Sequence, residues 1–410
     1  MSDYLPDECL TEVLVRVPVK SLMRFRCVAK TWHSLISSPA FIATHLNHAR
    51  HKASHGERSK LQDQIILFRH YSACEYADED DHGYRTWITS DEEECFALHK
   101  DDESFPHSPT LNLKPPHNMW SGQYFPIVGL MNGIVCLVDW SRCIFWNPSL
   151  NTTMETSFRT GAGTFFRPVM HIFGLGCDPI TNDLKLVRLA YLKKNVVPPV
   201  VEIFTLVTKS WREVAAPGPM YILVQSKSSP QAFVSGAFHW VAHTPPGQGS
   251  SSNVIVAFDM ENEVFYEIAL PSCLSSKPHL NMTVVLLNGS LVLVPDNEVY
   301  GDSYYSNSVW IMKEYGVVES WTKLFDIDIG EQGVRRVITF RNNGELLLNS
   351  DGKELLSYEP YTRETRDLHF KVRPSDGTSY ETGSYFVDTH MESLVLLNEA
   401  HRPRLVGRIS

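Results

Sequence analysis

The sequence predicts a small all-α module followed by an all-β propeller of six kelch-like blades. Three observations support this architecture: apolar residues recur at helical spacing in the first forty-odd residues, short β-type segments fill the chain beyond residue 60, and one strand-turn-strand unit recurs among them. The length of 410 residues also exceeds the roughly 250–300 residues of a single core, which favours a modular chain.

Apolar periodicity predicts four short helices near the start of the chain. The first lies between Pro6 and Pro18, since proline disrupts a helix interior, and its apolar face comprises Leu10, Val13, Leu14 and Val17. Further apolar stripes follow at Leu22 and Phe25, at Trp32, Leu35 and Ile36, and at Phe41, Ile42, His45 and Leu46. Ser38 and Pro39 supply a capping oxygen and a helix-opening proline for the last helix.

A helical unit of this size is at the lower limit for independent stability and needs a further stabiliser. Its apolar content suits two alternatives, docking onto a partner protein or packing on the following domain. We place this module at residues 3–48, a basic linker at 49–61 and the propeller at 62–400.

The repeat in the body is a polar turn followed by a strand that often begins with an aromatic residue. The unit is clearest at 209–214 and recurs at 263–268, 319–324 and 363–368, with two earlier copies around Thr153 and Phe96. The intervals of 57, 58, 54, 56 and 44 residues cluster near the ~50 residues of a kelch-type blade. Six copies predict six blades, and a β-sandwich is the alternative.

A further strand pair, at 385–388 and 393–397, remains after the last repeat. We expect it to pair with the N-terminal strand at 64–68 in one shared blade, which would close the ring and protect its edges.

Composition and charge narrow the partners. The chain is 43% apolar and 20% charged, as in ordinary globular proteins, and it lacks a membrane span or secretory signal, so we expect an intracellular protein of the cytoplasm or nucleus. Residues 1–60 hold nine Lys/Arg against five Asp/Glu, a net charge of +4, which leaves −14 for the rest. That acidic body argues against nucleic acid and membranes as partners and suits a cationic or neutral protein.

No sequence motif indicates catalysis, a cofactor or a metal site. The hydrolase, nucleotide and zincin signatures are missing, and the eight cysteines form no CxxC pair, so we interpret them as free thiols. His239 and His243 would share one side of a strand and form the best candidate metal pair, but packing and hydrogen bonding explain them better. The histidines at 45, 48, 51 and 55 are interpreted as a solvated helix end.

Two segments have the composition of binding loops. Residues 296–307 combine tyrosines with carboxylates, as protein-binding surfaces do, and the candidate client-binding residues are Asp296, Glu298, Tyr300, Asp302, Tyr304 and Tyr305. The acidic stretch from Glu75 to Glu103 resembles an insertion in the first blade that contributes charge. Either segment would serve equally well as a solvated insertion.

Residues 5–35 resemble the F-box, the helical module by which substrate receptors dock onto the Skp-type adaptor of cullin-RING ubiquitin ligases. The resemblance implies that seven residues contact the adaptor or shape the contact: Leu5, Pro6, Leu10, Leu14, Leu22, Val28 and Trp32. Of these, Trp32 fits internal packing better than direct contact.

The body resembles the F-box-associated interaction domain of the plant F-box/kelch-related family. The resemblance rests on the segments 129–136, 146–148, 173–183 and 309–316. It implies a non-catalytic substrate-recognition subunit of an SCF-type ligase, bound to the adaptor, a cullin scaffold and a client protein that is ubiquitinated and degraded. Pollen self-incompatibility F-box proteins, whose clients are secreted ribonucleases, are similar as well. The alternatives from other classes are a copper oxidase-like kelch propeller and an adaptor-bound scaffold.

Overall fold

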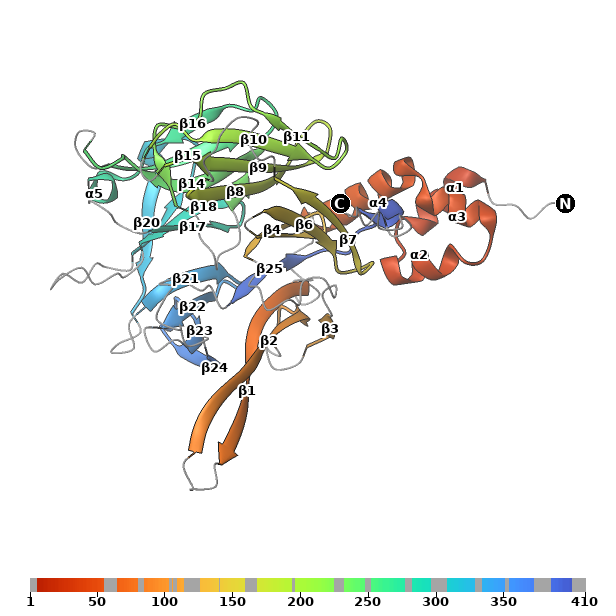
Figure 1. Cartoon of the computed structure of the whole chain (residues 1–410), viewed down its shortest axis with the longest axis horizontal. Coiled ribbons are helices and arrows are strands. Elements are labelled where there is room, and N and C mark those ends of the chain that lie inside the picture. Colours follow the sequence, from red (N-terminus) through yellow and green to blue (C-terminus); the bar gives the residue numbers. More distant parts are fainter. Residues whose placement is uncertain are drawn as a thin grey trace, which may run out of the picture.

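A computed structural model shows a helical module beside a six-bladed β-propeller (Figure 1). It describes residues 6–54, 65–79, 85–102, 105, 109–113, 126–139, 141–158, 168–193, 196–224, 232–247, 252–276, 282–295, 308–328, 334–350, 354–371 and 385–399. For 70–79 and 85–94 only the backbone is described. The two predicted architectural parts are therefore confirmed, and the β-sandwich is excluded.

Four helices form the helical module, which comprises residues 6–54: α1 (Asp7–Leu14), α2 (Val19–Phe25), α3 (Lys30–Ser37) and α4 (Pro39–Ser54). Prolines occupy the N-cap positions of α1 and α2, and the Ser38 hydroxyl accepts a hydrogen bond of 3.2 Å from the amide of Phe41 at the start of α4. Helix α4 runs to Ser54, into the range expected to be a linker.

Two details of the helical module differ from the prediction. Helix α1 ends at Leu14, well before Pro18, and Val13 is exposed instead of joining Leu14 in the core. His45 is buried rather than solvated, because α4 packs that side chain toward Phe41 and the segment around Val17.

The six sheets each have four or five strands, ordered from the first, inner position outward. The first blade comprises β25 (Phe386–His390), β1 (Ile65–Glu79), β2 (Arg85–Lys100) and β3 (Leu111–Leu113), the second β4 (Ile127–Met131), β5 (Ile134–Val138), β6 (Arg142–Asn147) and β7 (Thr152–Ser157). The third comprises β8 (Met170–Cys177), β9 (Leu184–Tyr191), β10 (Val200–Thr205) and β11 (Ser210–Glu213), the fourth β12 (Ile222–Leu223) with β13 (Ala232–Val234), β14 (Ala237–His243), β15 (Asn253–Asp259) and β16 (Phe265–Ile268). The fifth comprises β17 (Met282–Leu287), β18 (Ser290–Pro295), β19 (Ser308–Met312) and β20 (Trp321–Asp326), the sixth β21 (Val334–Phe340), β22 (Leu346–Ser350), β23 (Glu354–Tyr358) and β24 (Thr365–Lys371). Short helical turns lie at α5 (Ser272–Ser275), η3 (Val318–Ser320) and η5 (Leu397–Glu399).

Strand direction gives the ring two different faces. On the turn face, the first strand of a blade joins the second and the third joins the fourth; on the loop face, the other connections emerge. Three two-residue hairpins on the turn face have φ > 0 at both positions, at 132–133, 235–236 and 288–289. Asn-Gly and Ser-Gly sequences suit this turn because glycine and asparagine tolerate a left-handed backbone.

The predicted repeat corresponds to the turn before the fourth strand. Lys209, Glu263 and Arg363 all have left-handed backbones, and each amide donates to the carbonyl four residues earlier. The copy at Phe96 was placed wrongly, because Phe96 lies on β2, the third strand of its blade, and β3 is the fourth. The long β1–β2 hairpin lengthens the first blade, so the spacing of the repeats no longer matches its strands. The hairpin projects away from the ring as an extension of this blade (Figure 1).

The ring closes by pairing its two ends. Strand β25 pairs antiparallel with β1, from Ile65 opposite His390 to Arg69 opposite Phe386, which confirms the shared blade. The second predicted strand, at 393–397, is wrong: those residues form a turn leading into η5. Because β25 already fills the inner position of the blade, the chain leaves the ring, and Leu394 and Leu397 pack against the helical module.

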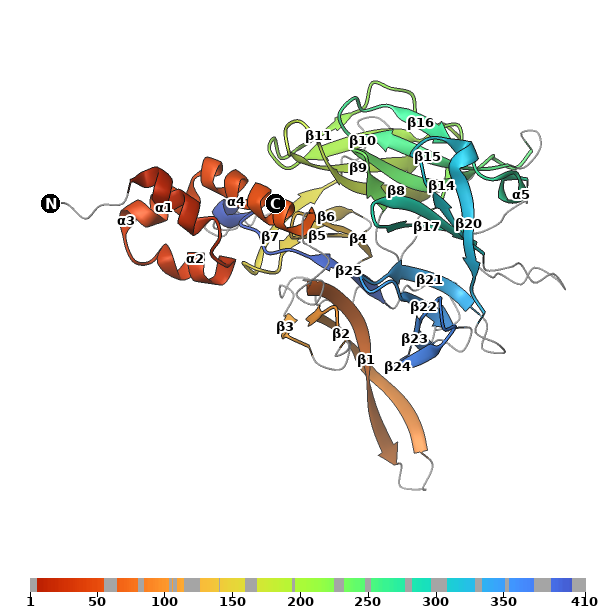
Figure 2. The same ribbon diagram turned by 180° about the vertical axis from the view of Figure 1, so that it is seen from behind.

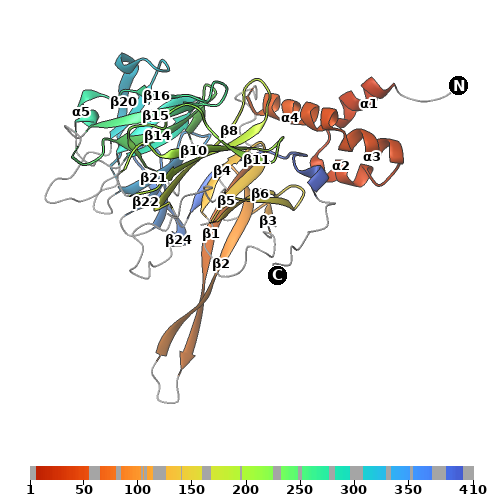
Figure 3. The same cartoon turned by 45° about the horizontal axis from the view of Figure 1, so that its top comes forward.

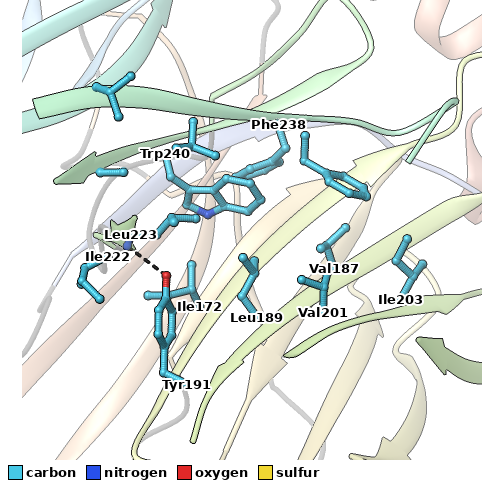
Figure 4. Close-up of a cluster of buried hydrophobic side chains, with 14 of the residues drawn as sticks. Ile172, Val187, Leu189, Tyr191, Val201, Ile203, Ile222, Leu223, Phe238 and Trp240 are labelled. Carbon is cyan, nitrogen blue, oxygen red and sulfur yellow. Dashed lines mark hydrogen bonds between the residues drawn. The ribbon is translucent and has the colours of Figure 1, made fainter. Parts of the chain in front are cut away.

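Apolar clusters between neighbouring blades hold the ring together, and the helical module has its own cluster. Figure 4 shows the cluster between the third and fourth blades, where Trp240 and Phe238 pack above Leu189 and Val187. Seen from behind, the blades surround the centre and the helices remain to one side (Figure 2). Among the described residues, no helix combines the length and hydropathy needed to cross a bilayer.

Candidate interaction surfaces

The helical module presents apolar side chains that its own core leaves uncovered. Val28, in the connection between α2 and α3, is 69% exposed, and Val13 at the end of α1 is 58% exposed. Pro6, at the start of α1, is exposed as well. Exposed single apolar residues are common on protein surfaces, but three in one module of about fifty residues supply apolar area for a partner.

The seven F-box-type positions divide into surface and core. Pro6 and Val28 are exposed, whereas Leu14 and Leu22 are only 2% and 0% exposed and belong to the module's core. Leu10 and Trp32 are half-buried, and the Trp32 ring packs edge-on against Phe25 at 5.4 Å between centroids. Leu5 lies outside the described residues. Sequence spacing missed Val13 as a surface residue, since periodicity placed it on the buried face.

The six candidate client-binding residues, from Asp296 to Tyr305, lie outside the described residues. Their flanking strands nevertheless fix where the segment begins and ends. Strand β18 ends at Pro295 and β19 starts at Ser308, and the second and third strands of a blade are joined at the loop face. The β1–β2 connection belongs to the same face, because it also joins a second strand to a third.

A set of exposed apolar residues on the loop face of the third blade escaped the sequence analysis: Val169, Val196, Val200 and Met220. They lie on segments that contact one another around Tyr191. The amide of Val169 donates to the Tyr191 carbonyl, and the Tyr191 hydroxyl donates to the carbonyl of Tyr221 at 2.8 Å. A Cβ on Gly218 would lie 2.6 Å from the Pro199 carbonyl oxygen, so those two segments also touch.

Sequence could not reveal this surface because its residues come from three separate segments of the chain, before β8, from the end of β9 to the start of β10, and before β12. Figure 4 shows buried residues of the same region. Tyr191 lies beside Ile222, and the Tyr191 hydroxyl accepts a 3.2 Å hydrogen bond from the amide of Leu223. Burial raises the pKa of Tyr191 to about 12, although the amide of Leu223 acts in the opposite direction, so the phenol stays neutral and keeps donating.

His239 is a structural residue. Its Nδ1 lies 3.0 Å from the Ala232 carbonyl oxygen and its Nε2 lies 2.7 Å from the Tyr315 hydroxyl, which in turn lies 2.5 Å from the hydroxyl of Tyr266. Since a carbonyl only accepts, Nδ1 carries the proton and Nε2 accepts from Tyr315. Burial lowers the pKa of His239 to about 4, so it stays neutral. Both ring nitrogens are therefore occupied, as the packing interpretation required.

Charged side chains are paired within and between the blades. Lys185 reaches Asp178 at 2.7 Å and Glu263 of the next blade at 3.0 Å. Burial raises the pKa of Asp178, but the hydrogen bond from Lys185 and two backbone amides prevail and lower it to about 2. Arg188 and Glu202 form a buried pair at 2.5 Å. Within the described part of the chain, no three His, Cys, Asp or Glu side chains converge as a metal site would require.

A helical module with uncovered apolar residues, carried by a β-propeller, defines a two-module interaction protein. Comparison with protein families identifies both parts. Residues 3–44 match the F-box domain, and residues 95–404 match the F-box associated beta propeller domain. The chain therefore belongs to the family of F-box proteins with an F-box associated propeller.

Curated relatives from Arabidopsis thaliana agree with this assignment. The F-box/kelch-repeat protein At3g23880 is 29% identical over 327 residues, which cover 79% of each chain. F-box protein At3g07870 is 25% identical and covers 91% of this chain and 89% of its own length. F-box protein CPR1 is 24% identical over 96% of this chain and 89% of its own.

Proposed function

We propose that this protein is the substrate-recognition subunit of an SCF-type cullin-RING ubiquitin ligase. The F-box docks onto a Skp-type adaptor and through it onto a cullin, and the propeller captures a client protein. The subunit contributes no covalent chemistry; it holds the client close to the transfer machinery, which raises the effective concentration of the reacting groups. Ubiquitination then leads to degradation of the client.

The observation that supports adaptor docking most directly is the exposure of Val28 and Val13 on a module whose core residues Leu14 and Leu22 are buried. A few residues that become buried near the centre of an interface carry most of its binding free energy. We therefore assign Pro6, Val13 and Val28 to the adaptor contact, with Leu10 and Trp32 at its edge. Leu14 and Leu22 support the contact from the core.

The test is binding of the full chain to a recombinant Skp-type adaptor. Val28→Asp should weaken binding at least tenfold, because it places a charge in an apolar contact. Val207→Asp is the matched control, since Val207 is 76% exposed on a propeller turn and should leave binding unchanged. Equal binding by both variants would contradict the assignment. Leu14→Asp is unsuitable, because Leu14 is buried and the change would unfold the module.

For the client we propose the loop face, because most of the long connections between strands emerge there. The acidic body favours a cationic or neutral client. The apolar surface at Val169, Val196, Val200 and Met220 supplies described contact residues, and the segment 296–307 belongs to the same proposal.

Mass spectrometry of proteins retained by the full chain tests the client surface. The double variant Val200→Asp/Met220→Asp should lose the client and keep the adaptor, whereas Val28→Asp should lose the adaptor and keep the client. A client retained by the double variant would place recognition elsewhere. Recognition of a secreted ribonuclease, as in pollen self-incompatibility, stays a prediction that the identity of this client would decide.

A further inference from the structure

The segment 391–399 leaves the propeller after β25 and enters the F-box core. Leu394 and Leu397 are 0% and 1% exposed and share one buried cluster with Leu14, Leu22 and Phe41. Figure 3 shows the blue C-terminal turn beside the red helices, although hundreds of residues separate them in the chain. The F-box core is therefore built from both ends of the described chain.

Polar contacts attach this segment to the ends of two helices. The Glu392 carboxylate accepts a 2.9 Å hydrogen bond from the amide of Val19, the first residue of α2. The preceding N-cap is Pro18, whose side chain offers no acceptor, so Glu392 satisfies an amide that would otherwise lack a partner. At the other end, the Asn398 side chain donates to the Ser37 carbonyl at the end of α3, at 3.3 Å.

The second blade holds the opposite side of the segment. The Asn147 side-chain amide donates to the carbonyls of Ser393 and Val395 at 3.0 and 2.7 Å. A Cβ on Gly133 would lie 2.5 Å from the carbonyl oxygen of Met391, so this turn leaves no room for a side chain. Glu399 also forms an ion pair with Lys209 of the third blade.

Arg50 makes an independent connection between the F-box and the propeller. From α4 its Nε donates to Asn132 at 2.9 Å, and its two terminal nitrogens donate to Asn182 and, at 2.8 Å, to the sulfur of Cys177. Asn132 and Asn182 lie in turns of the second and third blades, so one side chain fixes the helix against both.

We propose that residues 391–399 are an integral part of the F-box and that, together with Arg50, they hold it in one orientation on the propeller. The adaptor-binding module is then split: it needs a segment that is separated from α1–α4 by all six blades. The first half of the proposal concerns folding alone, and its consequence for adaptor binding rests on the proposed function.

Hydrogen exchange of the full chain, without adaptor, tests the split module. Leu397→Ser should raise exchange of the α2 and α3 amides at least tenfold and leave the fourth and fifth blades unchanged. Leu293→Ser is the matched control, because Leu293 is 0% exposed between the fourth and fifth blades, and it should leave exchange of the α2 and α3 amides unchanged. Unchanged α2 and α3 exchange in Leu397→Ser would overturn the proposal, whatever the adaptor does.

If Leu397→Ser does not fold, Glu392→Gln serves the same purpose with a smaller change. The neutral amide is a weaker acceptor for the amide of Val19, so exchange in the first turn of α2 should rise severalfold while α1 remains unchanged. In the unaltered chain, adaptor binding should also slow exchange of the Leu397 amide. If the adaptor binds and does not alter that amide, the segment is not part of the module.

Distance measurements between two spin labels test the fixed orientation. The labels are placed at Ser34→Cys on α3 and Glu261→Cys on a blade turn, both exposed positions, after replacing the exposed Cys9, Cys27 and Cys273 with serine. One narrow distance distribution is expected, and Arg50→Gln should broaden it. Lys52→Gln, an exposed neighbour on α4, should not. A broad distribution before mutation, or no effect of Arg50→Gln, would contradict the proposal.

Discussion

Gly133 lies where a turn of the second blade meets the segment 391–399. Its φ of +74° is a left-handed conformation, and its Cβ position would fall 2.5 Å from the carbonyl oxygen of Met391. Both a strained backbone and a steric overlap therefore oppose any side chain here. Gly289 has a φ of +78° with nothing within 4 Å of its Cβ position, so at Gly289 only the left-handed backbone opposes a side chain.

This difference between two glycines gives a prediction at the scale of one residue. Gly289→Ala should lower the free energy of unfolding by about 1–2 kcal/mol through backbone strain. Gly133→Ala should cost about 1–3 kcal/mol more, because the added methyl group overlaps the C-terminal segment. Urea denaturation of both variants measures the difference. Equal losses would mean that the segment moves aside without cost.

The residues predicted to form or support the adaptor contact show what sequence alone could establish at this scale. Helical spacing correctly indicated that Leu14 and Leu22 belong to a buried stripe. It could not distinguish a stripe covered by a partner from one covered by the same chain, because the covering residues Leu394 and Leu397 lie at the far end of the sequence. The exposure of Val28 likewise depends on where the α2–α3 connection points.

At the scale of the element, three histidines on strands of different blades are shielded from solvent: His239 and His390 are buried, and His171 is half-buried. Burial lowers the pKa of His171, His239 and His390 to about 4 in each case. His171 on β8 also accepts a hydrogen bond from Arg188 at 3.1 Å, and that positive charge further opposes protonation. All three therefore remain neutral in the folded chain at pH values where the unfolded chain binds protons.

The sign of the resulting pH dependence follows from proton counting. Between pH 6.5 and 4 the unfolded chain holds more protons on these histidines, so the free energy of unfolding falls as the pH falls. Asp388 acts in the opposite direction: burial raises its pKa to about 7, so in this pH range the folded chain holds a proton that the unfolded chain lacks. Its contribution cancels that of one histidine. These four groups together should lower the free energy of unfolding toward pH 4 by up to about 3 kcal/mol per pH unit. His45, whose pKa burial also lowers, adds to that loss.

Urea denaturation at pH 7, 6 and 5 measures this slope. His171→Gln should reduce this slope by the contribution of about one proton. His51 is exposed on α4, so the control variant His51→Gln should leave the slope unchanged. A flat stability profile from pH 6.5 to 5 in the original chain would show that these histidines titrate normally.

The repeated turn was the element best predicted from sequence. Lys209, Glu263 and Arg363 precede the fourth strands of three blades with the same left-handed conformation, and the recurrence of this turn indicated the spacing of the blades. The first blade departed from that pattern because its second and third strands extend into a long hairpin, and the aromatic residue Phe96 therefore marks the wrong strand.

At the scale of the whole molecule, one five-residue strand closes the ring. Phe386 of β25 is 1% exposed and packs with Leu67, Phe96, Ile127 and Trp146 between the first and second blades. Phe386→Ala should lower the free energy of unfolding by about 3–5 kcal/mol through the cavity it leaves. Phe325→Ala, at a half-buried site in the fifth blade, should cost less.

Thermal unfolding, followed separately in the F-box and in the propeller, checks this closure. Because β25 leads directly into the segment 391–399, Phe386→Ala should lower the midpoint of both modules together. A propeller that melts earlier beside an unchanged F-box would contradict the coupling. The sequence predicted the closure from the two segments that remained after the last repeat. It could not show that the second segment, at 393–397, packs in the F-box core instead.

The split core also sets an order of events during synthesis. A ribosome that adds about 5–20 residues per second needs roughly 17–70 s to pass from the end of α4 to Leu397. Throughout that time the nascent helices lack two of their core leucines. A chain that stops within the blades would never acquire them, and under the proposed function it would not compete with complete chains for the cell's supply of adaptor.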